Sequence, residues 1–266
     1  MSSQSIWSTE RGHGMPVVMI HGYTVDHRVL LPLEAAFSGE ASLRRIYVDL
    51  PGHGNSPRLP GVTTASALAD AVIDWIENTI GSEPFVVVGQ SFGGQIARAV
   101  TARLGVQVLG MALLVPVVTW GEDRILPAMT TVGRDEALLA QLPASERELF
   151  AAVMTRLDQP GWELFTTHIL PGWEAHDRDA AAELEAEFLL PRLPEATAAP
   201  HDGQHLLITT RNDALVGWHD QLSLLEHYPH MSTAILTDVG HSPQVESSAV
   251  VCDLIGHWLD RLELQG

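Results

Sequence analysis

A serine in a glycine-rich setting is the strongest chemical signal in the chain. Residues Gly89-Gln90-Ser91-Phe92-Gly93 form a G-x-S-x-G pentapeptide. It directly follows an apolar run and directly precedes a predicted helix, the context in which this motif forms a nucleophile elbow. At such an elbow a sharp turn exposes the serine, and the flanking glycines let strand and helix approach closely. We therefore predict that Ser91 is a nucleophile that forms covalent acyl intermediates.

A serine hydroxyl is a weak nucleophile and needs a base. His241 follows the last predicted strand and precedes the last predicted helix, which distinguishes it among the 13 histidines. The base needs an acid that holds its tautomer. Asp213 follows the penultimate strand, and the order Ser91, Asp213, His241 is the chain order expected with this motif. Asp238, three residues before His241, is the second candidate for the acid.

Acyl transfer also requires backbone N–H groups that stabilise an oxyanion. One is expected from Phe92, directly after the serine, and the other from the loop His21-Gly22-Tyr23 after the first strong strand, with the amide of Tyr23 preferred. His21 is expected to support this loop and not to react. No spacing among the histidines indicates a metal site and no motif indicates a cofactor, so neither is expected.

Alternating strand and helix patterns must position these residues. An unbroken apolar run, typical of a strand buried on both faces, occurs at residues 16–20. Further strands are predicted at residues 45–48, 85–88, 108–115, 206–209 and 233–236. Helices are predicted at residues 29–37, 64–80, 95–104, 221–227 and 247–262. The alternation predicts an α/β fold with a mostly parallel central sheet flanked by helices.

The pattern changes between residues 119 and 200. No strand is predicted there, and helical stretches broken by prolines are expected near residues 135–142, 145–157, 161–169 and 179–190. This segment is too long for a loop. We interpret residues 119–200 as a helical cap, inserted into a discontinuous core domain of residues 1–118 and 201–266.

The predicted cap is rich in large apolar side chains: Trp120, Leu126, Met129, Leu139, Phe150, Met154, Trp162, Phe165, Ile169 and Trp173. Because a cap and a sheet enclose a cleft, some of them are expected to line a pocket above Ser91. The expected partner is a small molecule with an apolar portion. Arg28 could bind a substrate carboxylate, but we expect an ion pair with nearby acids instead.

Together these pieces resemble the α/β-hydrolase superfamily. The matching residues are His21-Gly22-Tyr23, the D-x-P-G-H-G-x-S segment at 49–56, Gly89 to Gly93, Asp213 and Gly240-His241. The resemblance covers about residues 12–118 and 201–264. It implies an eight-stranded sheet with a cap after strand six, and a structural role for the 49–56 turn and its His53. Only about ten residues precede Gly12 and Gly14, so the first antiparallel hairpin is expected to be abbreviated.

A serine at position 91 limits the reactions that are expected of this chain. Members that resemble haloalkane dehalogenases and soluble epoxide hydrolases carry an aspartate in place of Ser91, so these activities are not expected. The leading hypothesis is a serine hydrolase that cleaves a small or medium carboxylic ester, lactone or thioester through an acyl-enzyme. Hydrolysis of a C–C bond next to a ketone is the close alternative. Two other classes remain: a receptor-like ligand-binding protein, and a non-hydrolytic lyase or cofactor-free oxygenase that uses His241 and Asp213.

Composition limits the partners. With 45% hydrophobic and 18% charged residues, the 266-residue chain is expected to be neither disordered nor collagen-like. Its 15 basic and 33 acidic residues give a formal charge of −18, so neither nucleic acids nor anionic membranes are expected partners. The single cysteine, Cys252, precludes an intrachain disulfide and a Cys-based zinc site. We found no signal peptide and no apolar run of membrane-spanning length, so a cytoplasmic protein is expected.

Overall fold

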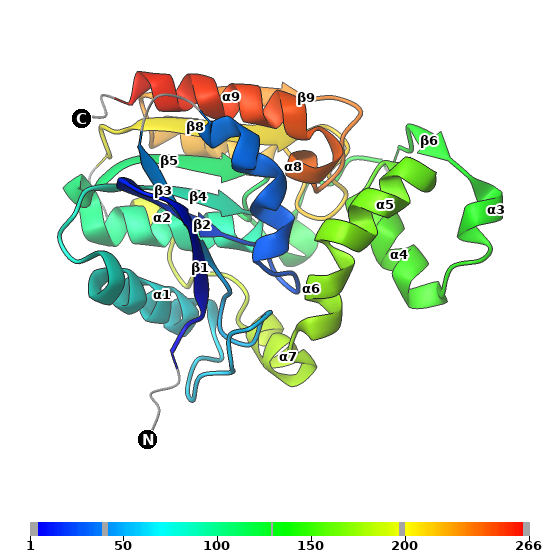
Figure 1. Cartoon of the computed structure of the whole chain (residues 1–266), viewed down its shortest axis with the longest axis horizontal. Coiled ribbons are helices and arrows are strands. Elements are labelled where there is room, and N and C mark those ends of the chain that lie inside the picture. The colour runs from blue at the N-terminus through cyan, green and yellow to red at the C-terminus, as the bar shows by residue number, and fades with distance from the viewer. Residues whose placement is uncertain (1–4, 39–41, 129, 197–199, 263–266) are drawn as a thin grey trace.

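A twisted sheet forms the centre of the molecule (Figure 1). The computed structural model describes residues 5–38, 42–128, 130–196 and 200–262. Within these ranges the sheet has seven strands in the order β1-β3-β2-β4-β5-β8-β9. The strands are β1 (Ser8–Gly12), β2 (Met15–Ile20), β3 (Leu43–Val48), β4 (Phe85–Gln90), β5 (Val108–Leu114), β8 (Gln204–Thr210) and β9 (Met231–Leu236). All neighbours pair in parallel except β1 and β3, which confirms the expected mostly parallel sheet.

The N-terminal edge differs from the expectation in strand number. The expected number of eight strands is wrong, since the sheet of the described residues has seven. The expected abbreviation of the first hairpin accounts for the difference, because β1 is the one strand that precedes β2 from residue 5 onward. Strand β1 was not predicted: its residues Ser-Thr-Glu-Arg-Gly have no apolar alternation. It pairs through its backbone with β3, from Ser8 opposite Val48 to Gly12 opposite Arg44.

The central strands explain the unbroken apolar runs. In β4 the side chains of Phe85 and Val87 belong to the core on one face of the sheet, and those of Val86 and Val88 to the core on the other. Successive side chains of a strand point to opposite faces. A strand covered on both sides must therefore be apolar at every position.

Helices cover both faces of the sheet. One core includes buried residues of α1 (Ala65–Ile80) and α2 (Phe92–Leu104), and the other includes those of η1 (His27–Phe37) and α9 (Ser248–Arg261). The predicted helices at 29–37 and 221–227 exist as 3₁₀ helices, η1 and η5 (Asp220–Glu226). The short elements of the core are η2 (Gly105–Gln107) and α8 (Pro243–Glu246).

The segment between β5 and β8 is mainly helical. Its helices are η3 (Gly121–Asp123), α3 (Glu136–Leu139), α4 (Ala144–Val153), α5 (Gln159–His168), α6 (Leu170–Ala175), α7 (Arg178–Ala186) and η4 (Pro194–Ala196). We call residues 119–200 the insertion. The expectation that it contains no strand is wrong, because β6 (Gly133–Arg134) and β7 (Arg156–Leu157) pair in parallel. Two-residue strands are too short to leave a periodic pattern in the sequence.

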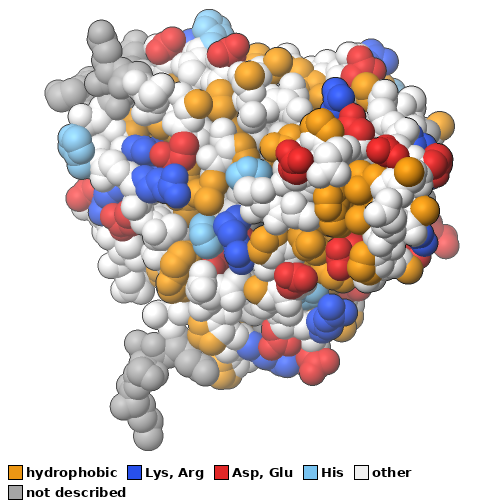
Figure 2. Space-filling model, turned by 45° about the vertical axis from the view of Figure 1, so that its right-hand side comes forward, with side chains coloured by type: hydrophobic (Ala, Val, Ile, Leu, Met, Phe, Trp, Pro, Cys, Tyr) orange, Lys and Arg blue, Asp and Glu red, His pale blue; other side chains and the backbone are white. Residues whose placement is uncertain are grey.

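The insertion lies at the carboxyl ends of the strands. Figure 1 shows α4, α5 and α6 beyond the arrowheads of β4 and β5. Figure 2 shows hydrophobic side chains gathered on the side of the molecule that the insertion occupies. Exposed apolar residues of the insertion include Ile125, Leu126 and Val132. No helix in the described ranges is long and apolar enough to cross a membrane.

Candidate active site

Ser91 occupies the turn between β4 and α2 in a backbone conformation that few residues other than glycine adopt. Its φ angle is +53°, and such conformations persist where the surroundings enforce them. A Cβ at Gly93 would lie 2.3 Å from the carbonyl oxygens of Ile20 and His21, and one at Gly89 would lie 2.4 Å from the carbonyl oxygen of Gly93. Both glycines are therefore needed for the close approach of α2 to the sheet.

The structure brings Ser91, His241 and Asp213 together. The Nε2 atom of His241 lies 2.8 Å from the Oγ atom of Ser91, and its Nδ1 atom lies 2.8 Å from the Oδ2 atom of Asp213. Ser91 and His241 are each 7% exposed and Asp213 is fully buried. The three residues come from the ends of β4, β9 and β8, which lie in one sheet.

Backbone amides fix the Asp213 carboxylate. Its Oδ1 atom accepts hydrogen bonds from the N–H groups of Leu215 and Val216 at 2.9 and 3.0 Å, leaving Oδ2 for His241. Asp238, the second candidate, occupies a turn with a φ angle of +59°, and its carbonyl oxygen lies 3.1 Å from the Oγ1 atom of Thr155. The acid that contacts His241 is thus Asp213.

The two residues predicted to form an oxyanion hole lie next to Ser91. Phe92 is the first residue of α2, directly after Ser91. Tyr23 follows β2 and lines the same pocket as Ser91. The rings of Tyr23 and Phe92 are 6.4 Å apart. The hydroxyl group of Tyr23 donates a hydrogen bond to the carbonyl oxygen of Ala181 in α7, so this side chain joins the core to the insertion.

His21 supports the loop that carries Tyr23. The Leu50 N–H group donates to Nε2 at 2.9 Å, so the other ring nitrogen, Nδ1, carries the proton and donates to the carbonyl oxygen of Gly22 at 2.7 Å. Burial lowers the pKa of His21. A neutral imidazole with both nitrogens engaged in backbone hydrogen bonds cannot serve as a base, as expected from the sequence.

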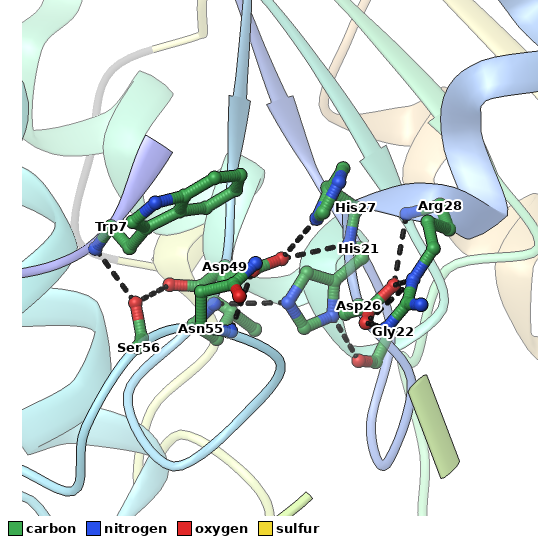
Figure 3. A network of polar contacts seen from close by, with 10 residues as sticks. Trp7, His21, Gly22, Asp26, His27, Arg28, Asp49, Asn55 and Ser56 are labelled. Atoms are coloured by element: carbon green, nitrogen blue, oxygen red, sulfur yellow. Dashed lines mark hydrogen bonds and ion pairs between the residues drawn. The ribbon is translucent and has the colours of Figure 1, made fainter. Parts of the chain in front are cut away.

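A polar network stabilises the turn at residues 49–56 beside this loop (Figure 3). The Asp49 carboxylate accepts hydrogen bonds from His27 Nδ1 at 2.7 Å and from the Asn55 N–H group at 2.8 Å. These hydrogen bonds outweigh the effect of burial and lower the pKa of Asp49 to about 2. Burial lowers the pKa of His53 to about 3, and its Nδ1 atom contacts the Pro51 carbonyl oxygen. His53 is therefore a buried residue of the turn.

The acidic groups next to this network are already engaged. The Oδ1 atom of Asp26 accepts hydrogen bonds from the Nε and backbone N–H groups of Arg28, each at 3.0 Å. The expected ion pair of Arg28 with a nearby acid is confirmed. Asp26, His27 and Asp49 offer oxygen and nitrogen atoms within 4.8 Å of one another. Because Arg28, Asn55 and His27 itself satisfy these carboxylates, the cluster is explained without a metal ion.

An apolar cavity of about 230 Å³ opens above Ser91. Its lining comprises Gly22, Tyr23, Thr24, Val25, Val29, Gln90, Ser91, Trp120, Leu149, Ala152, Val153, Ile169, Phe188, Leu215, Val216, His241 and Ser242. No Lys, Arg, Asp or Glu belongs to this lining in the part of the chain that the structure describes. Such a lining favours contact with apolar, uncharged groups.

The insertion supplies part of this lining, although not mainly through the residues singled out in the sequence. Of those, Trp120 and Ile169 line the cavity, and Met129 lies outside the described residues. Leu139, Phe150, Met154 and Phe165 are buried in the core that also includes η1 and α9. Phe188 and three residues of α4, Leu149, Ala152 and Val153, also line the cavity and had not been singled out. The spacing of these three at i, i+3 and i+4 indicates one helix face.

Phe188 forms an aromatic wall with residues next to Ser91. Its ring centroid lies 4.3 Å from that of Trp120, 4.8 Å from that of Phe92 and 5.1 Å from that of Tyr23. The buried Gln95 of α2 holds this segment by two hydrogen bonds, donating to the Phe188 carbonyl oxygen and accepting from the Leu190 N–H group, each at 3.0 Å. The wall is thus fixed to the helix that follows Ser91.

Comparisons with known proteins match this architecture. The model of the alpha/beta hydrolase family matches residues 17–254. A pimeloyl-(acyl-carrier protein) methyl ester esterase of Shewanella woodyi is 33% identical over 112 residues, which is 42% of this chain and 40% of that protein. The match thus spans less than half of that esterase. A 2-hydroxymuconate semialdehyde hydrolase of Pseudomonas sp. is 25% identical over 272 residues, covering 94% of this chain and 88% of that protein.

Solved structures share the fold. The crystal structure of an alpha/beta superfamily hydrolase from Oenococcus oeni superposes with a TM-score of 0.88 and a sequence identity of 24%. The match covers 98% of this chain and 97% of the Oenococcus chain. The family match extends from within β2 to α9 and includes Ser91, Asp213 and His241. The protein therefore belongs to the alpha/beta hydrolase family.

Proposed function

We propose that this protein is a serine esterase that hydrolyses a small or medium uncharged carboxylic ester, lactone or thioester through an acyl-enzyme on Ser91. One observation carries the proposal: the His241 imidazole bridges Ser91 and Asp213, with 2.8 Å on each side, at an apolar cavity. Residues 119–200 act as the cap of this cavity. No cofactor or metal is needed for the chemistry.

The proposed reaction uses each residue in turn. His241 takes the proton of the Ser91 hydroxyl group as the oxygen attacks the ester carbonyl carbon, and the N–H groups of Tyr23 and Phe92 stabilise the oxyanion. Asp213 orients the imidazole and stabilises its protonated form. The imidazolium then donates its proton to the leaving alcohol. Water attacks the acyl-enzyme with the same assistance and releases the acid.

The cavity lining limits the substrate. A carboxylate placed among these apolar side chains would lose its hydration without gaining a cationic partner, at a substantial cost in free energy. Arg28, the cation nearest in sequence to the oxyanion loop, is paired with Asp26. We therefore propose that the group bound next to Ser91 carries no charge.

Hydrolysis of a C–C bond is the second candidate. The similarity to a 2-hydroxymuconate semialdehyde hydrolase over 94% of the chain favours it. The absence of Lys and Arg from the described cavity lining argues against an anionic substrate of that kind. An uncharged ketone would fit the cavity lining equally well, and the same triad would serve both reactions.

Release of p-nitrophenol from acyl esters of two to twelve carbons tests the proposal. We expect turnover with the wild-type protein, an optimum at short chain length, and a loss of activity with Ser91→Ala. Two substrates of equal acyl length, p-nitrophenyl butyrate and mono-p-nitrophenyl succinate, test the charge preference, and the butyrate should react faster.

Two outcomes would contradict the esterase proposal. Full activity of Ser91→Ala would favour a mechanism led by His241, such as that of a lyase or oxygenase. A folded wild-type protein that turns over no ester would favour a C–C hydrolase or a binding protein, and uncharged β-diketones would then be the next substrates to assay.

A further inference from the structure

Glu246 is a half-buried acid at the end of α8 that has no ion-pair partner among the described residues. Its Oε1 atom accepts a hydrogen bond from the N–H group of Thr155 at 2.6 Å. Its Oε2 atom accepts from the hydroxyl group of Thr155 at 2.6 Å and from the N–H group of Gly240 at 3.4 Å. Burial raises the pKa of Glu246, and these hydrogen bonds oppose the shift. Neutral donors thus hold the carboxylate in place.

The partners of Glu246 belong to two parts of the candidate site. Thr155 lies in the insertion, two residues after Val153, whose side chain lines the cavity. Gly240 lies in the loop after β9 and directly precedes His241. A Cβ at Gly240 would be 3.2 Å from the carbonyl oxygen of Val153, so insertion and loop are also in close backbone contact.

The backbone next to His241 is held from two directions. The carbonyl oxygen of Gly240 accepts a hydrogen bond from the hydroxyl group of Thr210 in β8 at 2.8 Å, while its N–H group donates to Glu246. In addition, the Oγ1 atom of Thr155 lies 3.1 Å from the carbonyl oxygen of Asp238 in the same loop. Both polar groups of the residue before His241 are therefore fixed.

The energetics favour a specific role for the carboxylate. Removing an ionised acid from water without an ion-pair partner costs free energy, and an apolar or amide side chain would fill the space at lower cost. The guanidinium of Arg156 forms its ion pair with Asp158, and its attraction lowers the pKa of Glu246 less than any of that carboxylate's hydrogen bonds does. The two carboxylate oxygens of Glu246 can accept hydrogen bonds from Thr155 and Gly240 at the same time. A side-chain amide has only one acceptor atom, because its other terminal atom is a donor.

We propose that Glu246 is a positioning residue that joins the cavity wall of the insertion to the loop of His241 and thereby holds the imidazole between Ser91 and Asp213. This rests on the proposed function, since it assigns His241 as the base. This role goes beyond the proposed function, because the position of the insertion and the geometry of the base then depend on one carboxylate.

Glu246→Gln tests the role, because it keeps the size of the side chain and an acceptor for the Thr155 N–H group but turns an amide toward Gly240. We expect kcat for p-nitrophenyl butyrate to fall about tenfold to a hundredfold, the range that a small displacement of a reacting group produces. The matched control is Glu34→Gln. Glu34 accepts hydrogen bonds from Arg45 and Tyr47 and does not line the cavity. This control should lower the melting temperature and leave kcat unchanged.

A double-mutant cycle with Thr155→Val tests the link itself, and that variant also serves if Glu246→Gln does not fold. Two residues that act through one contact give non-additive losses. The double variant should therefore be about as slow as the slower single variant. The proposal would be overturned if the fold losses in kcat of the two single variants multiply in the double variant. It would also be overturned by a Glu246→Gln variant that keeps the wild-type kcat and has only a lower melting temperature.

The proton on Nδ1 of His241, seen by NMR in the absence of substrate, separates this inference from the proposed function. His241→Ala assigns its downfield resonance by loss of the signal. We expect Glu246→Gln to shift or broaden the resonance and Glu34→Gln to leave it in place, whether or not Ser91 hydrolyses any ester. An unchanged resonance in Glu246→Gln would overturn the positioning role, while failure of the esterase assay alone would contradict only the proposed function.

Discussion

At the residue scale, Asp213 is the fixed end of the chain of hydrogen bonds that runs through His241 to Ser91. Two backbone amides hold its carboxylate, so the amide of an asparagine would face His241 with the wrong hydrogen-bonding group. We expect Asp213→Asn to lower kcat about 10³–10⁴-fold, by analogy with the loss of the correct histidine tautomer in serine proteases. Asp238→Asn is the matched control and should retain activity in the same p-nitrophenyl ester assay.

At the element scale, the segment that follows α7 contributes Phe188 to the cavity lining. Phe188 packs against three aromatic rings in tilted or edge-on arrangements and lines the cavity. We expect Phe188→Ala to move the chain-length optimum to longer acyl esters, with kcat/KM for short esters reduced. The control Trp162→Phe changes a ring that packs inside the insertion, and an equal shift in that variant would contradict the assignment.

The same segment is joined to the core by a buried ion pair. Arg98 of α2 is 1% exposed, and its guanidinium Nε and Nη2 atoms each donate to the Glu195 carboxylate at 2.7 Å. The Tyr228 hydroxyl group also donates to Glu195 at 2.7 Å. Removal of one partner leaves a charge buried without compensation, so we expect Glu195→Ala to lower the free energy of unfolding by about 3–5 kcal/mol.

Urea denaturation checks this value. The control is the pair of Arg58 and Glu183, which joins the same two parts of the chain at the surface and has more than a third of each side chain exposed. Glu183→Ala should change the denaturation midpoint little, because solvent screens exposed ion pairs. A midpoint shift as large as that of Glu195→Ala would show that burial does not account for the difference.

At the scale of the whole molecule, buried neutral histidines make stability depend on pH. Burial lowers the pKa of both His53 and His205 to about 3, whereas in the unfolded chain the pKa of histidine is near 6.5. Between these values the unfolded state binds more protons. The free energy of unfolding should therefore fall as the pH drops below 6.5, by about 1.4 kcal/mol per pH unit for each histidine.

Chemical denaturation between pH 7 and pH 4 measures this slope. Replacement of one of the two residues, for example His205→Asn, should make the slope shallower even where it lowers stability at pH 7. An unchanged slope in both single variants would mean that these imidazoles do not remain neutral in the folded state over this range.

The sequence by itself determined the alternation of the core and the order of the chemical groups. Runs such as residues 85–88 are apolar at every position because both faces of the strand are buried. Ser91, Asp213 and His241 each follow a strand, and parallel strands bring their carboxyl ends to one edge of the sheet. Strand β1 and the short pair β6 and β7 were not found, since backbone pairing forms them without a side-chain pattern.

The cavity and its supports were decided only by the tertiary structure. Phe188 and Glu246 are separated from Ser91 and Thr155 by about ninety residues or more, and no local spacing relates such partners. Most of the large apolar side chains of the insertion pack against other parts of the core, and only Trp120 and Ile169 of those singled out face the cavity. Burial follows from composition, but the side of a helix that meets a substrate follows from how the helices pack on one another.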